Sequence, residues 1–141
     1  MSNDGWEHAT SDLCTIHDYG SAQELGERFR TVESALANRE HPIYLPGHAY
    51  HGEPIIVSEF GGMALAGSGG FGWNEAAGPE ALVTDYREMV AALMAPGPVE
   101  GFCYTQLTDI EQEKNGLLTE DRQPKADPAV IRQITQTPKR R

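Results

Sequence analysis

Apolar residues gather in three short runs along this chain, and each run has the length of a buried β-strand. The runs span residues 12–17, 54–59 and 99–104, and turn-forming residues bound each of them. None of the three alternates cleanly between apolar and polar side chains, which is typical of strands buried on both faces, as in parallel sheets. The pattern therefore predicts three buried parallel strands.

Between these runs the apolar residues recur every three or four positions, which predicts helices. The first helix spans 22–36, begins with the capping-box pattern Ser-Ala-Gln-Glu, and has Asn38 as its expected stop. The second spans 79–94 and ends at a Pro-Gly-Pro sequence, because proline cannot continue a helix. A last short helix is expected over 128–134.

The order of these elements is strand, helix, strand, helix, strand, loop, helix, which favours parallel βα units and an α/β fold. Successive runs begin 42 and 45 residues apart, whereas a minimal unit needs about 30 residues. The excess length lies in irregular stretches at 39–53, 61–78 and 105–127. Two of these stretches follow strands, and loops after parallel strands are where α/β proteins place their chemistry.

The composition shows that large apolar side chains are scarce. Leu, Ile, Val and Phe make up 27 of the 141 residues, and the formal net charge is −10. Such a combination is a compositional warning of disorder, and the length allows one domain. Either the chain orders poorly on its own, or something else completes its core.

The acidic balance narrows the classes of partner. A sequence pI near 4.8 argues against nucleic-acid binding, which needs clustered Lys and Arg, and the basic tail at 138–141 is expected to be disordered. No apolar stretch approaches the roughly 20 residues of a membrane helix, and no signal peptide is visible. Cys14 and Cys103 lie in apolar runs and are expected to be reduced core thiols, so we predict a cytoplasmic protein.

Each strand run finishes in residues that can carry chemistry. The end of the first run is His17, followed by Asp18 and Tyr19; the second ends in Glu59, and the third in Tyr104, followed by Gln106 and Asp109. A carboxylate at the end of a buried run is costly unless it is paired or functional. Glu59 pointing to solvent, with His17 and Tyr104 in the core, is the simpler alternative. Together, however, the residues fit the C-terminal rim of a parallel barrel.

Four blocks of residues occur in an order that is typical of a known family. They are 3–7 (NDGWE), 15–19 (TIHDY), 54–62 (PIIVSEFGG) and 101–118 (GFCYTQLTDIEQEKNGLL). Together they resemble the C-terminal part of the catalytic barrel of glycoside hydrolase family 2, the clan of β-galactosidases, β-glucuronidases and β-mannosidases. The resemblance runs from Asn3 to about Ile134, and it rests on the four blocks in order rather than on any single block.

The resemblance implies a partial (β/α)8 barrel. The three strands would be the sixth to eighth, and Asn3 to Trp6 would be the exit of the fifth. Residues 1–137 would form the C-terminal half of the barrel, and 138–141 would be the tail. Glu59 matches the catalytic nucleophile of the family. The other implied site residues would contact a β-glycoside or oligosaccharide: Trp6, His17, Tyr19, Tyr104, Gln106 and Asp109. We expect no cofactor and no metal ligand at these positions.

The general acid/base of such an enzyme is missing from this sequence. In the family it is a Glu that follows an Asn at the end of the fourth strand, and this chain begins after that strand. Asn74-Glu75 has the same letters but lies in the loop beyond the nucleophile. A whole barrel takes about 250 residues. We therefore expect the chain alone to hydrolyse no glycoside at a useful rate, and to need the missing N-terminal barrel half or an oligomer partner.

Two other functions stay open at this point. The first alternative is a sugar-binding or regulatory remnant without catalysis. In that case the aromatic rings of Trp6, Trp73 and Tyr104 would stack on sugar rings. The chain is a metal protein if its loop histidines act together; these are His41, His48 and His51. The spacing of the histidines matches no compact zinc site, so metal binding is the weaker of the two.

Overall fold

The structure is a computed structural model that describes residues 3–37 and 40–141, so the helix stop predicted at Asn38 lies outside the described residues. The elements are, in chain order, β1 (Cys14–Asp18), α1 (Ala22–Arg28), α2 (Val32–Ala35), β2 (Ile55–Gly61), β3 (Met63–Leu65), β4 (Asn74–Ala76), α3 (Pro79–Leu93), β5 (Val99–Thr105) and α4 (Pro128–Thr135). The three predicted strands, the second helix and the last helix are confirmed, with shifts of one or two residues at most of their ends.

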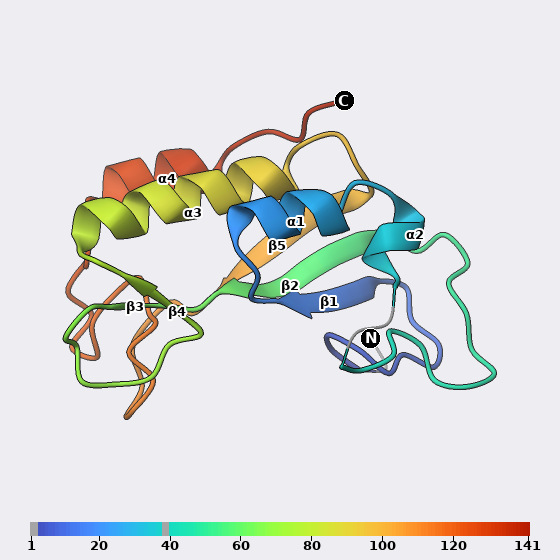
Figure 1. The fold of residues 1–141 in the computed structure, drawn as a ribbon, viewed down its shortest axis with the longest axis horizontal. Coiled ribbons are helices and arrows are strands. Elements are labelled where there is room, and N and C mark those ends of the chain that lie inside the picture. Colours follow the sequence, from blue (N-terminus) through green and yellow to red (C-terminus); the bar gives the residue numbers. More distant parts are fainter. Residues whose placement is uncertain (1–2, 38–39) are drawn as a thin grey trace.

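The three predicted strands form one parallel sheet in the order β1-β2-β5. Helices α1, α3 and α4 lie next to one another along a single face of this sheet (Figure 1). Each βα connection therefore crosses on the same side. The fold is mixed α/β, and its sheet follows the order of the chain.

The hydrophobic core lies between that face of the sheet and the helices. Its fully buried side chains come from all three strands and from α1 and α3; among them are Ile16, Leu25, Val57, Leu82, Tyr86, Val90 and Val99. The stripe predicted on the second helix is the face of α3 that is buried here. Burial of such side chains contributes about 1.5–3 kcal/mol each to folding.

The first predicted helix is two short helices rather than one. Helix α1 ends at Arg28, and Thr31 begins α2 with a capping box of its own. The Thr31 hydroxyl accepts from the Ser34 amide at 3.2 Å, and the Thr31 amide donates to the Ser34 hydroxyl at 3.1 Å. Hydroxyl side chains that bind nearby backbone groups compete with helix continuation, so the apolar stripe continues while the helix does not.

The segment 61–78 contains structure that its composition does not predict. Strands β3 and β4 pair with each other in parallel within it, so the expectation of an irregular loop is wrong there. Gly62 has a φ of +57° at the start of this segment, a conformation that glycine adopts without steric cost. Thr105 still belongs to β5, and the rest of the segment, 106–127, has only isolated bridges and no helix or strand among its residues, as expected.

Only one face of the sheet is fully covered. On β2 the helix-facing residues Ile55 and Val57 are buried, whereas Ile56 and Ser58 between them are only partly buried. Cys14 is buried, as predicted, but Cys103 on β5 is exposed. The expectations of burial on both faces and of a core position for Cys103 are therefore wrong, because the described helices all pack on the other face.

The C-terminal tail lies against the end of α3. We expected residues 138–141 to be disordered; in the structure the Lys139 ammonium donates to the Ala95 carbonyl at 2.7 Å, and the Arg140 amide donates to the Met94 carbonyl at 2.9 Å.

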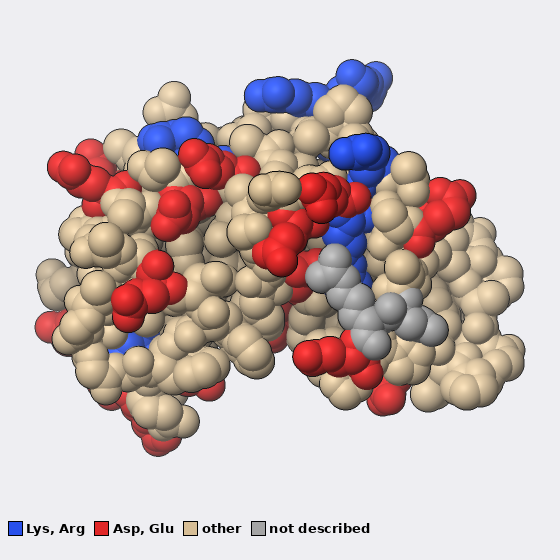
Figure 2. All heavy atoms as spheres, in the orientation of Figure 1, with Lys and Arg blue, Asp and Glu red and all other residues tan. Residues whose placement is uncertain are grey.

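Acidic side chains are spread over the face drawn in Figure 2, and basic ones gather towards its upper edge. Within the described part of the chain, no helix has the length and apolar character needed to cross a membrane.

Candidate functional site

A bulge in the central strand decides where Glu59 lies. Ile16 pairs with Val57, but the next residue of β1, His17, pairs with Glu59, so Ser58 is an extra residue. On the other side of β2, the span from Val57 to Phe60 is also one residue longer than the facing span of β5. Bulges re-aim side chains and are common beside active sites. This one places Glu59 directly opposite His17 at the C-terminal end of the sheet.

Two neighbours hold Glu59 through one carboxylate oxygen. The Tyr19 hydroxyl donates a hydrogen bond to Oε2, and His17 Nδ1 lies 3.3 Å from the same atom. The side chain of Glu59 is 36% exposed and that of His17 is 12% exposed. Burial and the neighbouring carboxylate raise the pKa of Tyr19 well above its usual value. The phenol therefore stays protonated and remains a donor at neutral pH.

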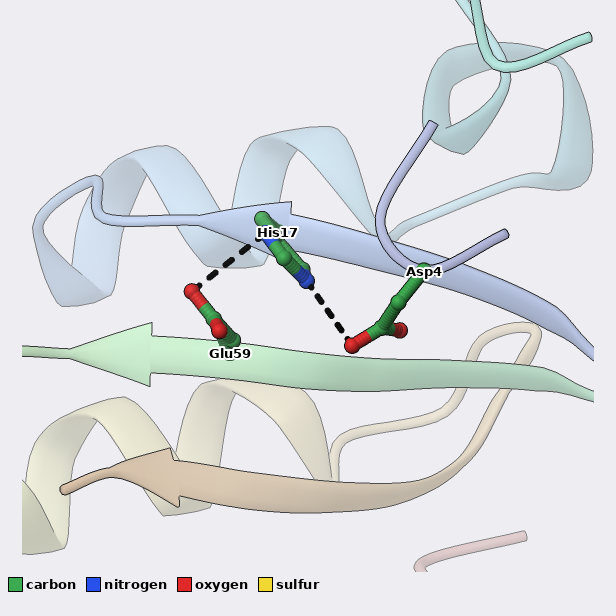
Figure 3. Close-up of side chains that lie close together, drawn as sticks. All are labelled: Asp4, His17 and Glu59. Atoms are coloured by element: carbon green, nitrogen blue, oxygen red, sulfur yellow. Dashed lines mark ion pairs between the residues drawn. The ribbon is translucent and has the colours of Figure 1, made fainter. Parts of the chain in front are cut away.

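His17 lies between two carboxylates that come from different parts of the chain (Figure 3). Its Nε2 atom is 3.2 Å from Oδ2 of Asp4, whose other oxygen accepts from the Ser58 hydroxyl at 2.7 Å. Burial alone would raise the pKa of Asp4, but hydrogen bonds from Ser58, Thr15 and His17 outweigh it and hold this pKa below its usual value. Asp4 is therefore ionised at neutral pH.

The N-terminal segment fixes the ring of His17. Gly5 has a φ of +84°, and a Cβ at this position would lie 2.6 Å from the His17 ring, so no larger residue fits without movement. The indole of Trp6 meets the His17 ring edge-on, with centroids 4.8 Å apart, and stacks on His41 at 4.8 Å. The segment thus closes over β1 and forms one wall of the site.

Tyr19 joins this site to the segment between β3 and β4. Its ring stacks on Trp73 with centroids 4.5 Å apart and an angle of 15° between the planes. The side-chain amide of Asn74 donates to the Tyr19 carbonyl at 3.0 Å and to the Gly61 carbonyl at 2.8 Å. Asn74 therefore ties the exit of β1 to the exit of β2, which keeps the Tyr19 ring beside Glu59.

These side chains surround a pocket of about 450 Å³, which is within the usual range for small-molecule sites. Four of the predicted site residues line it together: Trp6, His17, Tyr19 and Glu59. Gly5, Asp18, Arg28, Glu40, His41 and Trp73 are among the other lining residues. The pocket combines aromatic walls with a carboxylate and an imidazole, which are groups suited to a polar ring.

Tyr104 lies under the site rather than in it. Its hydroxyl accepts from the Met63 amide at 3.1 Å and donates to the Asn115 carbonyl at 3.3 Å, and burial raises the pKa of this phenol. A Cβ at Gly61, where φ is +85°, would lie 2.2 Å from the Tyr104 ring. Tyr104 thus packs against the end of the strand that carries Glu59.

Gln106 and Asp109 bind their own loop, and neither lines the pocket. The Gln106 amide donates to Asn115 Oδ1 at 2.8 Å and to Glu113 at 3.2 Å. The buried Asp109 accepts from the Lys125 ammonium at 2.7 Å and from a backbone amide at 2.8 Å. We expected both to touch substrate; the structure instead occupies their polar atoms in holding the segment after β5.

Sequence reasoning missed Asp4 as a member of the cluster. It lies in a polar stretch with no strand of its own, and its contact with Ser58 spans 54 positions, so no local pattern marks it. Among the described residues, Asp4, His17 and Glu59 are also the one group that could share a metal ion, with ligand atoms within 4.8 Å of one another. The three loop histidines considered as ligands are not part of this group.

No protein-family model matches the chain, and no curated protein matches it either. The similarity to glycoside hydrolase family 2 therefore stays a prediction from the four sequence blocks. The pocket around Glu59 and the contacts that hold its carboxylate are observed in the structure itself and do not depend on that similarity.

Proposed function

We propose that this chain is the nucleophile-bearing part of a retaining β-glycosidase. The observation that carries the proposal is the way Glu59 is held in its pocket. Tyr19 and His17 both contact Oε2, and no hydrogen bond from the described residues to Oε1 is seen. One oxygen is held by the protein while the other is available to attack, and a carboxylate is the nucleophile of retaining glycosidases.

The chemistry takes two steps. Oε1 of Glu59 attacks the anomeric carbon, the bond from that carbon to the leaving oxygen breaks, and a glycosyl ester forms on Glu59. Water then attacks the same carbon, releases the sugar and returns the carboxylate. Tyr19 and His17 keep Oε2 oriented through both steps. The leaving oxygen must take up a proton as it departs, and that proton comes from a second carboxyl group, which in the second step takes a proton back from the attacking water.

Asp4 does not meet the requirement for this proton donor. It places a carboxylate oxygen within 4.8 Å of Glu59, close to the separation of about 5–5.5 Å in retaining enzymes. However, its lowered pKa keeps it ionised at neutral pH, and His17 lies between the two groups. The acid/base residue is therefore expected on the missing part of the barrel, and the chain alone is expected to be a poor catalyst.

The arrangement of helices supports a barrel segment. Doubly wound α/β sheets carry helices on both faces, whereas barrel strands carry them on one face only. Here the helices share one face, and the strands follow one another in chain order (Figure 1). The opposite face, which holds Ile56 and Cys103, would be the barrel interior. The free edges of β1 and β5 would pair with the N-terminal half.

Covalent trapping tests the proposal on the chain as it stands. 2,4-Dinitrophenyl 2-deoxy-2-fluoro-β-glycosides of galactose, glucose and mannose carry a leaving group that needs no proton. We expect intact-protein mass spectrometry to show one added fluoroglycosyl group, mapped by peptide analysis to Glu59. Glu59→Gln should take up no label, while the matched control Glu75→Gln, an exposed residue on β4, should label normally. Equal labelling of Glu59→Gln would contradict the proposal.

Turnover is then tested by adding a polypeptide that carries the missing barrel half with its Asn-Glu pair. The mixture should hydrolyse an aryl β-glycoside, and Glu59→Gln should lower this rate by about 10⁴-fold or more. Robust Glu59-dependent hydrolysis by the chain alone would show that the acid/base argument is wrong. Saturable sugar binding without trapping or regained hydrolysis would favour the other candidate, a carbohydrate-binding remnant whose aromatic rings surround the pocket.

We also propose a cytoplasmic location. Cys14 and Cys103 are both free thiols, on different strands of the sheet. Free thiols of this kind are typical of reducing compartments.

A further inference from the structure

Two aromatic side chains beside the pocket are exposed to an unusual degree. Trp73 is 57% exposed and Phe71 is 47% exposed, although each carries a large apolar surface that folding normally buries. Their rings meet edge-on with centroids 5.4 Å apart. Trp73 lines the pocket that contains Glu59, whereas Phe71 does not. The pair therefore leads outward from the site along a continuous aromatic surface.

This surface is held in place from several sides. The Phe71 amide donates to the Gln112 carbonyl at 2.6 Å, and the Lys114 amide donates to the Phe71 carbonyl at 2.9 Å. These contacts join the segment before β4 to the loop after β5, which run beside each other at the left of Figure 1. A Cβ at Gly62 would lie 2.7 Å from the Trp73 ring. The exposed rings are therefore fixed rather than placed on a free loop.

Trp73 is also coupled to the reactive group through one residue. One side of its ring stacks on Tyr19 at 4.5 Å, and Tyr19 donates to Glu59. A ring packed against Trp73 would therefore lie one side chain away from a group bound at Glu59. Aromatic rings pair favourably with other aromatic rings, and the C–H face of a sugar ring offers a similarly flat apolar surface.

We propose that Trp73 and Phe71 bind a second ring of the substrate, aryl or glycosyl, linked to the sugar at Glu59. The inference rests on the proposed function, because it takes Glu59 to face a glycoside. It adds a preference within that function: glycosides that carry a second ring bind better than those that carry a small alkyl group.

The test is a titration that requires no hydrolysis. Methyl and phenyl β-D-galactopyranoside, and the same pair of glucosides, are titrated into the 141-residue chain by calorimetry. We expect a phenyl glycoside to bind about tenfold more tightly than its methyl partner. Trp73→Ala should bring this ratio close to one, Phe71→Ala should lower it, and Trp73→Phe should keep part of it. Leu45→Ala, which removes an exposed apolar side chain outside the pocket, should leave the ratio unchanged.

Circular dichroism and thermal melting establish that each variant is folded before it is titrated. Equal binding of the phenyl and methyl glycosides, an unchanged ratio in Trp73→Ala, or no saturable binding of any of the four would overturn the inference. So would a Trp73→Ala variant that weakens association with the barrel half without changing the ratio, since the patch would then be a protein contact. A phenyl preference that depends on Trp73, found where trapping at Glu59 fails, would overturn the proposed function and leave the binding surface standing.

Discussion

Glycines make the close packing around Glu59 possible. Gly5 lets the N-terminal segment approach the His17 ring, and Gly61, two residues after Glu59, lets the Tyr104 ring lie directly against the backbone. Both have positive φ values, a conformation that costs an L-residue with a side chain about 1–2 kcal/mol. At these positions a glycine therefore avoids two costs at once, backbone strain and a steric clash.

Gly61 and Gly47 form a matched pair that separates these two costs. Gly47 has a φ of +87° and no atom within 4 Å of the point that a Cβ would occupy, whereas Gly61 has a φ of +85° with the Tyr104 ring at 2.2 Å. We expect Gly47→Ala to lower the free energy of unfolding by about 1 kcal/mol through strain. Gly61→Ala should lower it by about 3 kcal/mol, because overpacking adds to the strain. Urea denaturation measures both, and equal losses would show that the Tyr104 ring moves aside freely.

At the scale of elements, the segment after β5 is a self-contained support. Asp109 and Lys125 form an ion pair whose side chains are only 7% and 5% exposed, and the Lys125 ammonium also donates to the Lys114 carbonyl at 2.8 Å. Gln106 adds its bonds to the same segment. The segment in turn binds the backbone at Phe71, so it supports the wall of the pocket from behind.

The ion pair gives a prediction that separates support from substrate contact. Removing one member of a buried pair leaves the other charge uncompensated, and this typically costs about 3–5 kcal/mol. We expect Asp109→Ala to lower the free energy of unfolding by about 3 kcal/mol. The double variant Asp109→Ala with Lys125→Met should recover part of this loss, which chemical denaturation would show. If Asp109→Ala left stability unchanged and weakened glycoside binding instead, Asp109 would belong to the site after all.

The elements that sequence could predict are those set by local pattern. The apolar runs give β1, β2 and β5, and Pro79 with the apolar stripe after it gives α3, because each signal lies within the element itself. Within the site, Glu59 and His17 stand out because they end such runs. Asp4 does not, since its partners Ser58 and His17 are distant in the chain. The break at Thr31 depends on the hydroxyl groups of Thr31 and Ser34, which the apolar spacing does not register.

For the whole molecule, the partly uncovered face of the sheet bears on why large apolar residues are scarce in this chain. A chain with few large apolar residues covers one face of its sheet with helices and leaves the other face partly uncovered. The N-terminal segment covers part of β1 by bonding to Thr15. On β2 and β5 the residues on that side, as far as the structure describes the chain, are exposed or only partly buried. The shortage of apolar residues is therefore in keeping with the proposed barrel segment, whose core another segment would complete.

The reactivity of the two thiols tests whether this partly uncovered face lies inside a barrel. Burial raises the pKa of Cys14, and Cys14 is fully buried while Cys103 is exposed. We expect an aromatic disulfide reagent to modify one thiol in the native chain and both in denaturant. When the missing barrel half is bound, Cys103 should react at least about tenfold more slowly, because it would then face the barrel interior. An unchanged rate for Cys103 in a mixture that hydrolyses glycosides would argue against that placement.

The bulge at Ser58 sets how much of β2 can change without moving Glu59. Successive side chains on a regular strand point to opposite faces, and β2 uses one residue more than either neighbour between Val57 and Phe60. A variant that lost Ser58 would pair one to one with both neighbours and would keep Glu59 opposite His17. Its loss would instead be felt at Asp4, whose carboxylate accepts a hydrogen bond from the Ser58 hydroxyl.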